Sequence, residues 1–479
     1  MARTIPNVPS TSPFGDVVGT DLHPYISLKG TYGLTDDHQV LTGFGGSASV
    51  VDAEYVLESG TTLYGYANVW SRQPIVYRAG IGCEARVTGR FSTPLALSQQ
   101  LCGLYSAADG MFAGYNGTRF GVMHRYGGEF HIVTLTVTVA ASGAETATLT
   151  LNGTAYTFAV TAGTTAHNAH EVEAGIAAGA AGTYWYAQHI GSTVKIVFKG
   201  AGAKSGAYTL TSTGTLAGTF ATVNTGVAPT ENWYYQEDWS NDKGGWFNAA
   251  KGNLFRFEFA YLGYGPLKWY IFHQDLLTWI LVHTVKWSNY NVGTNFGNPS
   301  LRVGWAVGSV GSSGTNVVMR GASGMAALQG KDSSPDRIFS AIANNASVST
   351  ETQILSVKVR YDFGSRFSNC IVLPSLNVAT DSTKGMIFRV YLNTTVAGTT
   401  THDYIDVNQS VCIYDTAGTT VSGGRILGAY VVGPSGSRAV SASDLGIVLA
   451  AGDELTITGQ VTSGAASGGF VTANLKEVI

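Results

Sequence analysis

Apolar and polar side chains alternate along much of this chain, with the period of two that a β-strand requires. The clearest example is the segment 254–261, in which Phe255, Phe257 and Phe259 share one side while charged residues occupy the other. A strand with this pattern buries one face and exposes the other, as in an antiparallel sheet. We therefore expect a half-buried strand here, and similar patterns recur toward both ends of the chain.

Turn signals separate these predicted strands. Asn116-Gly117 and Asn152-Gly153 each lie between alternating apolar residues and predict tight β-hairpins, because both central positions of such a turn favour a positive φ. One convincing helical pattern is present, at residues 166–178, with Thr164 or Thr165 as its N-cap. The sequence therefore predicts an all-β protein with a single helix.

A chain of 479 residues is too long for one ordinary core, so we expect a multi-domain β-sandwich or jelly-roll protein. The aromatic strand pattern stops near residue 134 and resumes at Trp233, which indicates a small β-rich module, containing the helix, inserted in the first sandwich. Prolines near the N-terminus predict an extended arm. The expected parts are an arm at 1–20, a sandwich at 21–134 plus 229–330, the inserted module at 135–228, a linker at 331–348 and a C-terminal sandwich or jelly roll at 349–479.

Charged residues make up only 12% of the chain, and the formal net charge is −3. This balance offers no basic stripe for phosphates, so it argues against a nucleic-acid partner. A neutral polar surface suits packing against other subunits, although a β-rich composition by itself also favours Thr and Val over Lys and Glu. No secretory leader and no apolar run of about 20 residues is evident, so we expect no membrane contact and synthesis in the cytoplasm.

Four widely spaced cysteines show no zinc-ligand spacing, and isolated buried thiols are the favoured interpretation. Pairing of Cys83 with Cys102, or of Cys370 with Cys412, stays open.

A glycoside hydrolase needs two carboxylates that face each other across a cleft. The acidic residues of this chain do not show the spacing of such a pair. Glu237 and Asp238 are adjacent and point to opposite faces of a strand, and Glu258 alternates with Arg256 instead of another acid. Asp403 and Asp406, three residues apart, also fall on opposite faces. We expect no catalytic residues.

His167 and His170 have the helical i, i+3 spacing of a metal-ligand pair. No third ligand lies near them in the sequence. We therefore expect no metal site and no cofactor.

Six of the nine tryptophans lie between Trp233 and Trp287. Sugars stack on aromatic faces, so a glycan platform is one interpretation of the first part of this run. Its candidate residues are Trp233, Tyr235, Trp239 and Trp246. The alternative, which we favour, is that these side chains fill the core where the module joins the host sandwich.

Three segments together resemble virion structural proteins of tailed bacteriophages and other large double-stranded DNA viruses. They are GYNGTRFGV, KGNLFRFEFAYLGYGPLKWYIFHQDLLTWILVHTV and NPSLRVGWAVGSVGSSGTNVVMRGAS, which are similar to a concanavalin-like or laminin-G-like sandwich. The module segment TLTLNGTAYTFAVTAGTTAHNAHEVEAGIAAG resembles small modules of phage tail and head-decoration proteins, and LAAGDELTITGQV resembles late strands of trimeric jelly rolls.

This resemblance implies a non-enzymatic component of a phage tail, baseplate or capsid surface. It implies a homo-oligomer, with a homotrimer as the first expectation, partnered by other virion proteins and by a host surface glycan. The alternative from another class is a glycan-binding hydrolase or depolymerase on a lectin-like sandwich. A cellular adhesion protein is a third interpretation, which the lack of a secretory leader disfavours.

Overall fold

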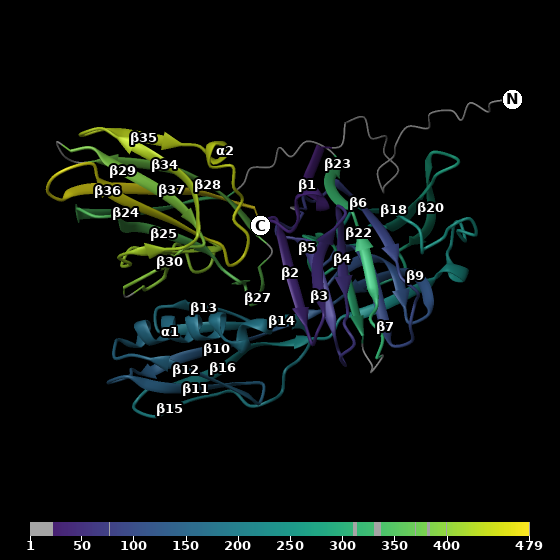
Figure 1. The fold of residues 1–479 in the computed structure, drawn as a ribbon, viewed down its shortest axis with the longest axis horizontal. Helices are drawn as coiled ribbons and strands as arrows, with labels where there is room; N and C mark the ends of the chain where they lie inside the picture. The colour runs from purple at the N-terminus through teal and green to yellow at the C-terminus, as the bar shows by residue number, and fades with distance from the viewer. Residues whose placement is uncertain are drawn as a thin grey trace. The chain divides into compact units, whose positions relative to one another are not determined.

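The computed structural model describes residues 23–75, 77–309, 314–329, 337–368, 370–380, 384–398 and 400–478. Every strand pair among them is antiparallel, and α1 is their one helix of more than four residues (Figure 1). The prediction of an all-β fold is confirmed. The expected arm at 1–20 lies outside the described residues.

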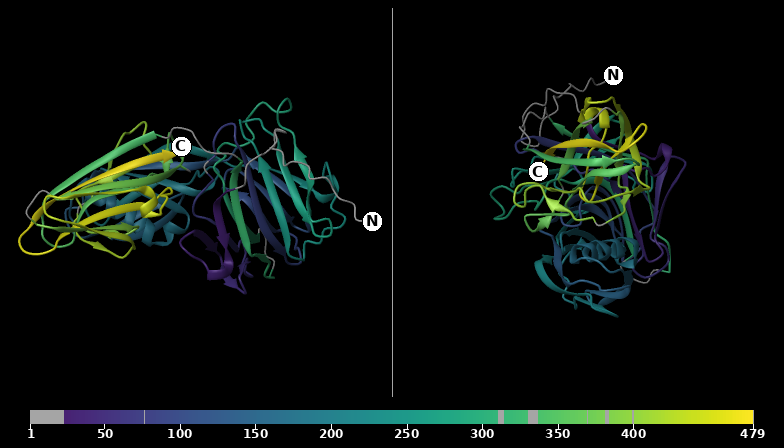
Figure 2. Two further views of the ribbon diagram at one scale, coloured as in Figure 1. Left: turned by 90° about the horizontal axis from the view of Figure 1, so that it is seen from above. Right: turned by 90° about the vertical axis from the view of Figure 1, so that its left-hand side faces the viewer.

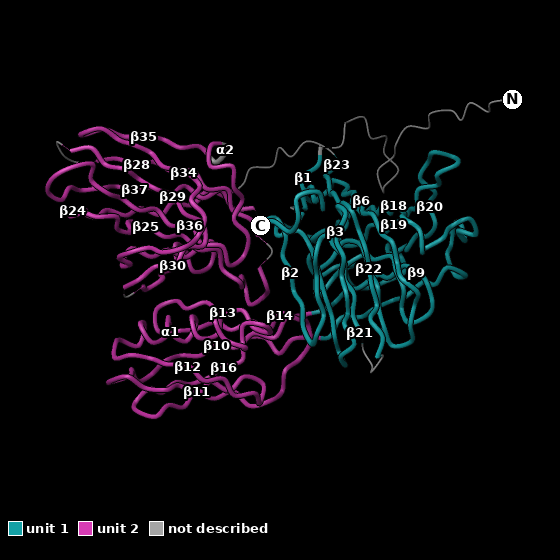
Figure 3. The backbone as a smooth tube through the Cα atoms, viewed as in Figure 1, with its two compact units in different colours: residues 1–128, 228–334 teal, residues 129–227, 335–479 magenta. Residues whose placement is uncertain are grey.

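The chain folds into two compact units, each discontinuous in sequence (Figure 3). Unit 1 spans residues 1–128 and 228–334, and unit 2 spans residues 129–227 and 335–479. The inserted segment, residues 129–227, is called the module below. It groups with the C-terminal sandwich, an association that the sequence does not predict.

Unit 1 contains two sheets. One has nine strands, in the order β20-β19-β18-β6-β22-β4-β3, with β23 paired to β6 and β1 paired to β23. Its strands are β1 (His23–Lys29), β3 (Ser47–Val51), β4 (Glu54–Glu58), β6 (Gly82–Phe91), β18 (Asn253–Phe259), β19 (Leu267–His273), β20 (Thr278–Val285), β22 (Val318–Gly321) and β23 (Ser323–Gln329). The other has seven strands, in the order β17-β9-β8-β7-β21-β5-β2. Its strands are β2 (His38–Gly43), β5 (Tyr66–Ser71), β7 (Ser98–Tyr105), β8 (Gly110–Asn116), β9 (Arg119–Tyr126), β17 (Thr230–Tyr235) and β21 (Arg302–Ser309). Two short 3-10 helices, η1 (Gly30–Tyr32) and η3 (Gln236–Asp238), lie in the connections.

One hydrophobic core joins the two sheets of unit 1. Phe255, Phe257 and Phe259 of β18 point into it and are at most 1% exposed, which agrees with the alternation seen in the sequence. Burying large aromatic side chains contributes roughly 1.5–3 kcal/mol each. The opposite side of β18 is not open to solvent as the sequence pattern suggests, because Glu258 is also buried.

The two predicted hairpins form, with different turns. Asn152 and Gly153 both have a positive φ between β11 (Glu145–Leu151) and β12 (Thr154–Val160), as a tight Asn-Gly turn requires. Between β8 and β9, Asn116 is the last paired residue, opposite Arg119. The loop is therefore Gly117-Thr118, with its positive φ at Gly117. The Asn-Gly signal gives the hairpin correctly but places its turn one residue early.

The module packs two small sheets and one helix around its own core. The four-stranded sheet contains β10 (Glu129–Val139), β13 (Trp185–Ile190), β14 (Thr193–Ala201) and β16 (Ala217–Val227). The three-stranded sheet contains β11 (Glu145–Leu151), β12 (Thr154–Val160) and β15 (Thr209–Ser212). Helix α1 (Thr165–Ala178), followed by η2 (Ala180–Thr183), runs alongside these strands (Figures 1 and 2). Thr164 is its N-cap, because its hydroxyl accepts a 3.1 Å hydrogen bond from the backbone N–H of His167.

The C-terminal part of unit 2 is a second two-sheet sandwich with its own core. One sheet contains β24 (Arg337–Val348), β28 (Ile371–Thr380), β35 (Ser437–Val440) and β37 (Ser467–Val478). The other contains β25 (Thr352–Val359), β29 (Met386–Leu392), β31 (Asp403–Tyr404), β32 (Cys412–Asp415), β34 (Arg425–Val432) and β36 (Glu454–Val461). Smaller elements are β26 (Asp362–Phe363), β27 (Arg366–Phe367), β30 (Thr395–Val396), β33 (Val421–Ser422) and α2 (Ala442–Leu445).

Strand β24 corrects the linker predicted at 331–348. It pairs with β37 from Arg337 to Asn345 and again at Val348, after a register shift. Hydrophobic alternation does not predict this strand correctly, because its buried side carries the small residues Ala341 and Ala343. The larger Ile338 and Ile342 are on the other side and are each 70% exposed.

All four cysteines are free thiols, so neither candidate disulfide forms. Burial raises the pKa of Cys83 and Cys102 far above the ordinary thiol value, which keeps both protonated and unreactive at neutral pH. Among the described residues, no helix is both long and apolar enough to cross a membrane.

Candidate ligand-binding face

The seven-stranded sheet of unit 1 has an outer face, directed away from the core, that combines aromatic, amide and guanidinium side chains. Strand pairing places these side chains in rows across the sheet. One row runs through Trp233, Met123, Phe112, Gly103, Gly304, Trp70 and Gln39. The next runs through Tyr235, Gly121, Gly114, Leu101, Ala306, Asn68 and Leu41. Large aromatic residues stand at both sides of these rows, and small residues occupy much of the centre.

Glycines in the centre of this face are required by the backbone. Gly103 and Gly114 have φ values of 154° and 157°. A Cβ added at Gly114 would lie 1.8 Å from the carbonyl oxygen of Gln100, and one at Gly103 would lie 2.1 Å from that of Met111. Glycines inside strands allow a sheet to bend sharply. Each of these glycines also leaves a gap between the side chains of the face.

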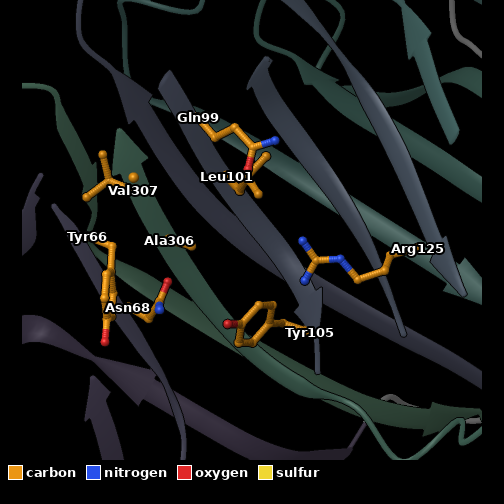
Figure 4. Close-up of a pocket in the computed structure, with 9 residues that line it drawn as sticks. Tyr66, Asn68, Gln99, Leu101, Tyr105, Arg125, Ala306 and Val307 are labelled. Atoms are coloured by element: carbon orange, nitrogen blue, oxygen red, sulfur yellow. The ribbon is translucent and has the colours of Figure 1, made fainter. Parts of the chain in front are cut away.

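A hollow of about 160 Å³ lies on this face (Figure 4). Its lining comes from β5, β7, β9 and β21, and consists of Tyr66, Asn68, Gln99, Leu101, Tyr105, Arg125, Ala306, Val307 and Gly308. Figure 4 shows the amides of Asn68 and Gln99 together with the Tyr105 ring and the Arg125 guanidinium around it. Polar and apolar side chains contribute about equally to this shallow lining.

Arg125 is held in place over the small apolar cluster beneath it. Its Nε and Nη2 donate to Glu231 Oε1 at 3.0 and 2.7 Å, and its guanidinium carbon lies 4.9 Å from the centre of the Phe112 ring. The arginine side chain is only 12% exposed. A planar guanidinium fixed in this way has little conformational freedom left to lose when it binds a ligand.

Trp233 and Tyr235 lie side by side on edge strand β17. Their rings are nearly parallel, with an interplanar angle of 12° and centroids 6.1 Å apart, and both side chains are partly buried. Asn116 donates a 3.2 Å hydrogen bond to the Tyr235 hydroxyl, and the Arg119 guanidinium carbon lies 3.5 Å from the Tyr235 ring centre. The two rings are therefore stacked at one side of the face, and Asn116 and Arg119 hold the Tyr235 ring in place.

The four residues of the predicted glycan platform do not share one surface of unit 1. Trp239 is 1% exposed in the core, and its indole N–H donates to the carbonyl oxygen of Tyr234 at 3.0 Å. Trp246 is 37% exposed and packs against His273 of the nine-stranded sheet, with ring centroids 4.3 Å apart. The favoured core interpretation thus describes Trp239, whereas Trp233 and Tyr235 belong to the outer face.

The acids considered from the sequence do not line the hollow. Glu237, in η3, pairs with Arg119, and this hydrogen bond lowers the pKa of Glu237. Asp238 lies beside it, 4.0 Å from the same arginine. Asp403 is exposed on β31, and Asp406 caps a turn by accepting from the backbone N–H of Asn408.

Glu258 does meet a second acid, which the sequence analysis missed. Cross-strand pairing sets it opposite Glu84, and both side chains are at most 1% exposed. Arg256 contacts both carboxylates, and the Tyr270 hydroxyl donates to Glu258 at 2.9 Å. Only strand register between β6 and β18 reveals this pair.

The two histidines of α1 have different surroundings. His167 Nε2 lies 3.3 Å from Glu171 Oε1 near the protein surface. His170 instead gathers with Glu173 of the same helix and His189 of β13, and their ligand atoms all lie within 4.8 Å of one another. A third potential metal ligand is therefore present, although it is distant in sequence.

Comparisons with known proteins add little to this description. No protein-family model and no curated protein matches the chain. Among solved structures, the Faustovirus major capsid protein is similar at 8% identity over 88% of this chain and 89% of that chain, with a TM-score of 0.10. A TM-score of this size is far below that of two proteins sharing a fold, so this likeness carries no argument about function.

Proposed function

We propose that the protein is a non-enzymatic structural component of a virion, and that its unit 1 binds carbohydrate on the outer face of the seven-stranded sheet. The observation that carries the binding proposal is the combination of the paired Trp233 and Tyr235 rings with the hollow beside Asn68, Gln99 and Arg125. Sugar rings present apolar C–H faces that stack on aromatic rings. Their hydroxyls take hydrogen bonds from amides and guanidinium groups.

The size of the face favours an oligosaccharide over a single sugar. Trp233 is on β17 and Asn68 is on β5, which are five strand spacings apart in the sheet. At about 4.8 Å per spacing, the two ends are roughly 24 Å apart. A chain of several sugar rings is needed to touch both. Arg119 and Arg125 of this face each pair with a glutamate, and Arg302, opposite Tyr105 on the same face, donates to Gln39 and to the backbone carbonyl oxygen of Ser71.

Assembly as a homo-oligomer is the second part of the proposal. Only 12% of the residues are charged, and the outer side of β24 and β37 exposes apolar side chains. Ile338 and Ile342 are each 70% exposed and Phe470 is 41% exposed, and pairing of Asn344 with Phe470 puts all three on one face. Exposed apolar groups of this kind suit contact with another subunit. The virion assignment rests on the resemblance of the sequence segments, and a homotrimer is its expected form.

Hydrolysis is the alternative from another class. It requires two carboxylates about 5–9.5 Å apart across a cleft. The residues lining the hollow include no acid, and Glu258 and Glu84 are buried around Arg256. These observations support the non-enzymatic proposal. Release of reducing ends from a bound polysaccharide would instead support the alternative.

The binding proposal is tested by screening the full chain against a glycan array and measuring the affinity of each hit. Trp233→Ala should weaken binding by about 5- to 150-fold, because one stacking contact contributes about 1–3 kcal/mol by analogy with bases on aromatics. Tyr290→Ala is the matched control, since Tyr290 is an exposed aromatic of unit 1 outside the hollow. Equal affinity of the unmodified chain, Trp233→Ala and Tyr290→Ala would contradict the assignment. So would a Trp246→Ala variant that loses binding while Trp233→Ala keeps it.

A further inference from the structure

The strongest unassigned feature of the protein is a buried histidine cluster in unit 2, where the module meets the C-terminal sandwich. His170 and Glu173 come from α1, His189 from β13, and His402 from the segment just before β31. His189 is 0% exposed and His402 is 3% exposed. Four potential metal ligands from three segments thus meet in a place that solvent hardly reaches.

Two of these imidazoles face each other at the distance expected of two ligands on one metal ion. His189 Nε2 lies 3.3 Å from His402 Nδ1. Zinc–nitrogen bonds of about 2.0–2.1 Å at a tetrahedral angle set two ligand nitrogens about 3.3 Å apart. His170 also packs against His189, with ring centroids 5.0 Å apart, and its Nδ1 is buried without a hydrogen-bond partner among the described residues.

A carboxylate lies behind each of the two facing rings, and the one behind His189 accepts a hydrogen bond from it. Glu173 Oε2 accepts from His189 Nδ1 and, at 2.9 Å, from the His189 backbone N–H. Glu454 Oε1 lies 3.7 Å from His402 Nε2, which has no hydrogen-bond partner among the described residues. A metal-binding histidine typically gives its second ring N–H to a carboxylate, as His189 does to Glu173, which fixes the tautomer that leaves the other nitrogen free for the metal.

The charge of the cluster also favours a cation. Glu173 and Glu454 bring two negative charges, and Lys358, in contact with Glu173 and 3.8 Å from Glu454, brings one positive charge. One negative charge is left among these three groups. Buried charge needs a counter-charge, and imidazole ligands suit zinc and related divalent transition metals.

We propose that His189 Nε2 and His402 Nδ1 bind one divalent transition-metal ion, with Zn²⁺ as the expected ion and His170, which packs on His189, as the nearest further imidazole. Glu173 and Glu454 position the ligands, and the bound metal fastens the module to the C-terminal sandwich. Sequence spacing cannot show this site, because 213 residues separate His189 from His402.

The test is metal binding by the full chain, first stripped with a chelator and then titrated with Zn²⁺, and separately with Co²⁺ as a spectroscopic probe. One metal ion per chain and the visible absorption of tetrahedral Co²⁺ are expected. His189→Gln and His402→Gln should abolish both signals. Glu173→Gln should weaken Zn²⁺ binding by about 10- to 100-fold, as expected for loss of a carboxylate behind a ligand.

His167→Gln is the matched control, because it alters a histidine of the same helix that lies beside Glu171 instead. It should bind metal like the unmodified chain, and circular dichroism checks that every variant is folded. Absence of bound metal in the unmodified chain, or metal retained by folded His189→Gln and His402→Gln, would overturn the proposal.

Discussion

Acid should weaken unit 1 through His124, a buried histidine of β9. His124 is 0% exposed, and its Nε2 donates to the carbonyl oxygen of Asn295 at 2.7 Å. The rings of Tyr126, Trp287 and Phe296 surround it. Burial lowers the pKa of His124 from 6.5 to about 4. The folded protein therefore keeps this ring neutral at a pH where the unfolded chain takes up a proton.

The sign and size of the effect follow from this difference in pKa. Because the unfolded state binds more protons below pH 6.5, the free energy of unfolding falls as the pH decreases from 6.5 toward 4. The gap between the two pKa values corresponds to about 3 kcal/mol, of which about 2.5 kcal/mol should be lost between about pH 7.5 and pH 4.5. His283, whose pKa burial also lowers to about 4, adds a loss of the same sign.

The assay is urea unfolding of the full chain at several pH values, read by hydrogen exchange in peptides from β8 and β9. His124→Gln removes the titrating group while its amide can still donate to Asn295, so it should lose most of its share of the pH dependence. His273→Gln changes a partly exposed histidine of the same unit and should leave the slope unchanged. An unmodified chain whose unit 1 stability is flat between about pH 7.5 and pH 4.5, or a His124→Gln variant with an unchanged slope, would refute the reasoning.

Two further predictions concern single side chains. Trp239→Ala should lower the free energy of unfolding of unit 1 by about 3–5 kcal/mol, since it empties a fully buried site, whereas Trp233→Ala on the outer face should cost clearly less; denaturant titration compares the two. Glu145→Gln should destabilise the module at neutral pH, because the backbone N–H groups of Leu216 and Thr215 lower the pKa of Glu145 to about 2. That stabilisation is present above the ordinary carboxyl pKa of 4.5 and is lost as the pH falls toward 2, so the difference in exchange rates between the two proteins should shrink in acid; a constant difference would argue against it.

The elements that the sequence predicts well are those with local signals. Alternation in 254–261 gives β18, and the helical pattern at 166–178 gives α1, with its Thr164 cap. Both depend on spacing within one segment. The hairpin at Gly117 shows the limit of such signals, because strand pairing shifts the turn by one residue.

Features made by pairing of distant strands could not be predicted in the same way. The outer face combines residues of seven strands, and each glycine in its centre looks ordinary in a chain with 61 glycines. Trp239 and Trp233 look alike in sequence, yet one is buried and the other is part of the face. The partners of His170 are likewise set by the packing of α1 on β13 and of the module on the C-terminal sandwich.

The most direct test of the central claim is a crystal structure of the full chain with an oligosaccharide taken from the glycan screen. We predict a sugar ring lying flat on Trp233 or Tyr235. Hydroxyls of the same oligosaccharide should lie within about 2.7–3.2 Å of Asn68, Gln99 or Arg125. An oligosaccharide bound at Trp246, on the nine-stranded sheet or on unit 2, with the outer face of the seven-stranded sheet empty, would contradict the account.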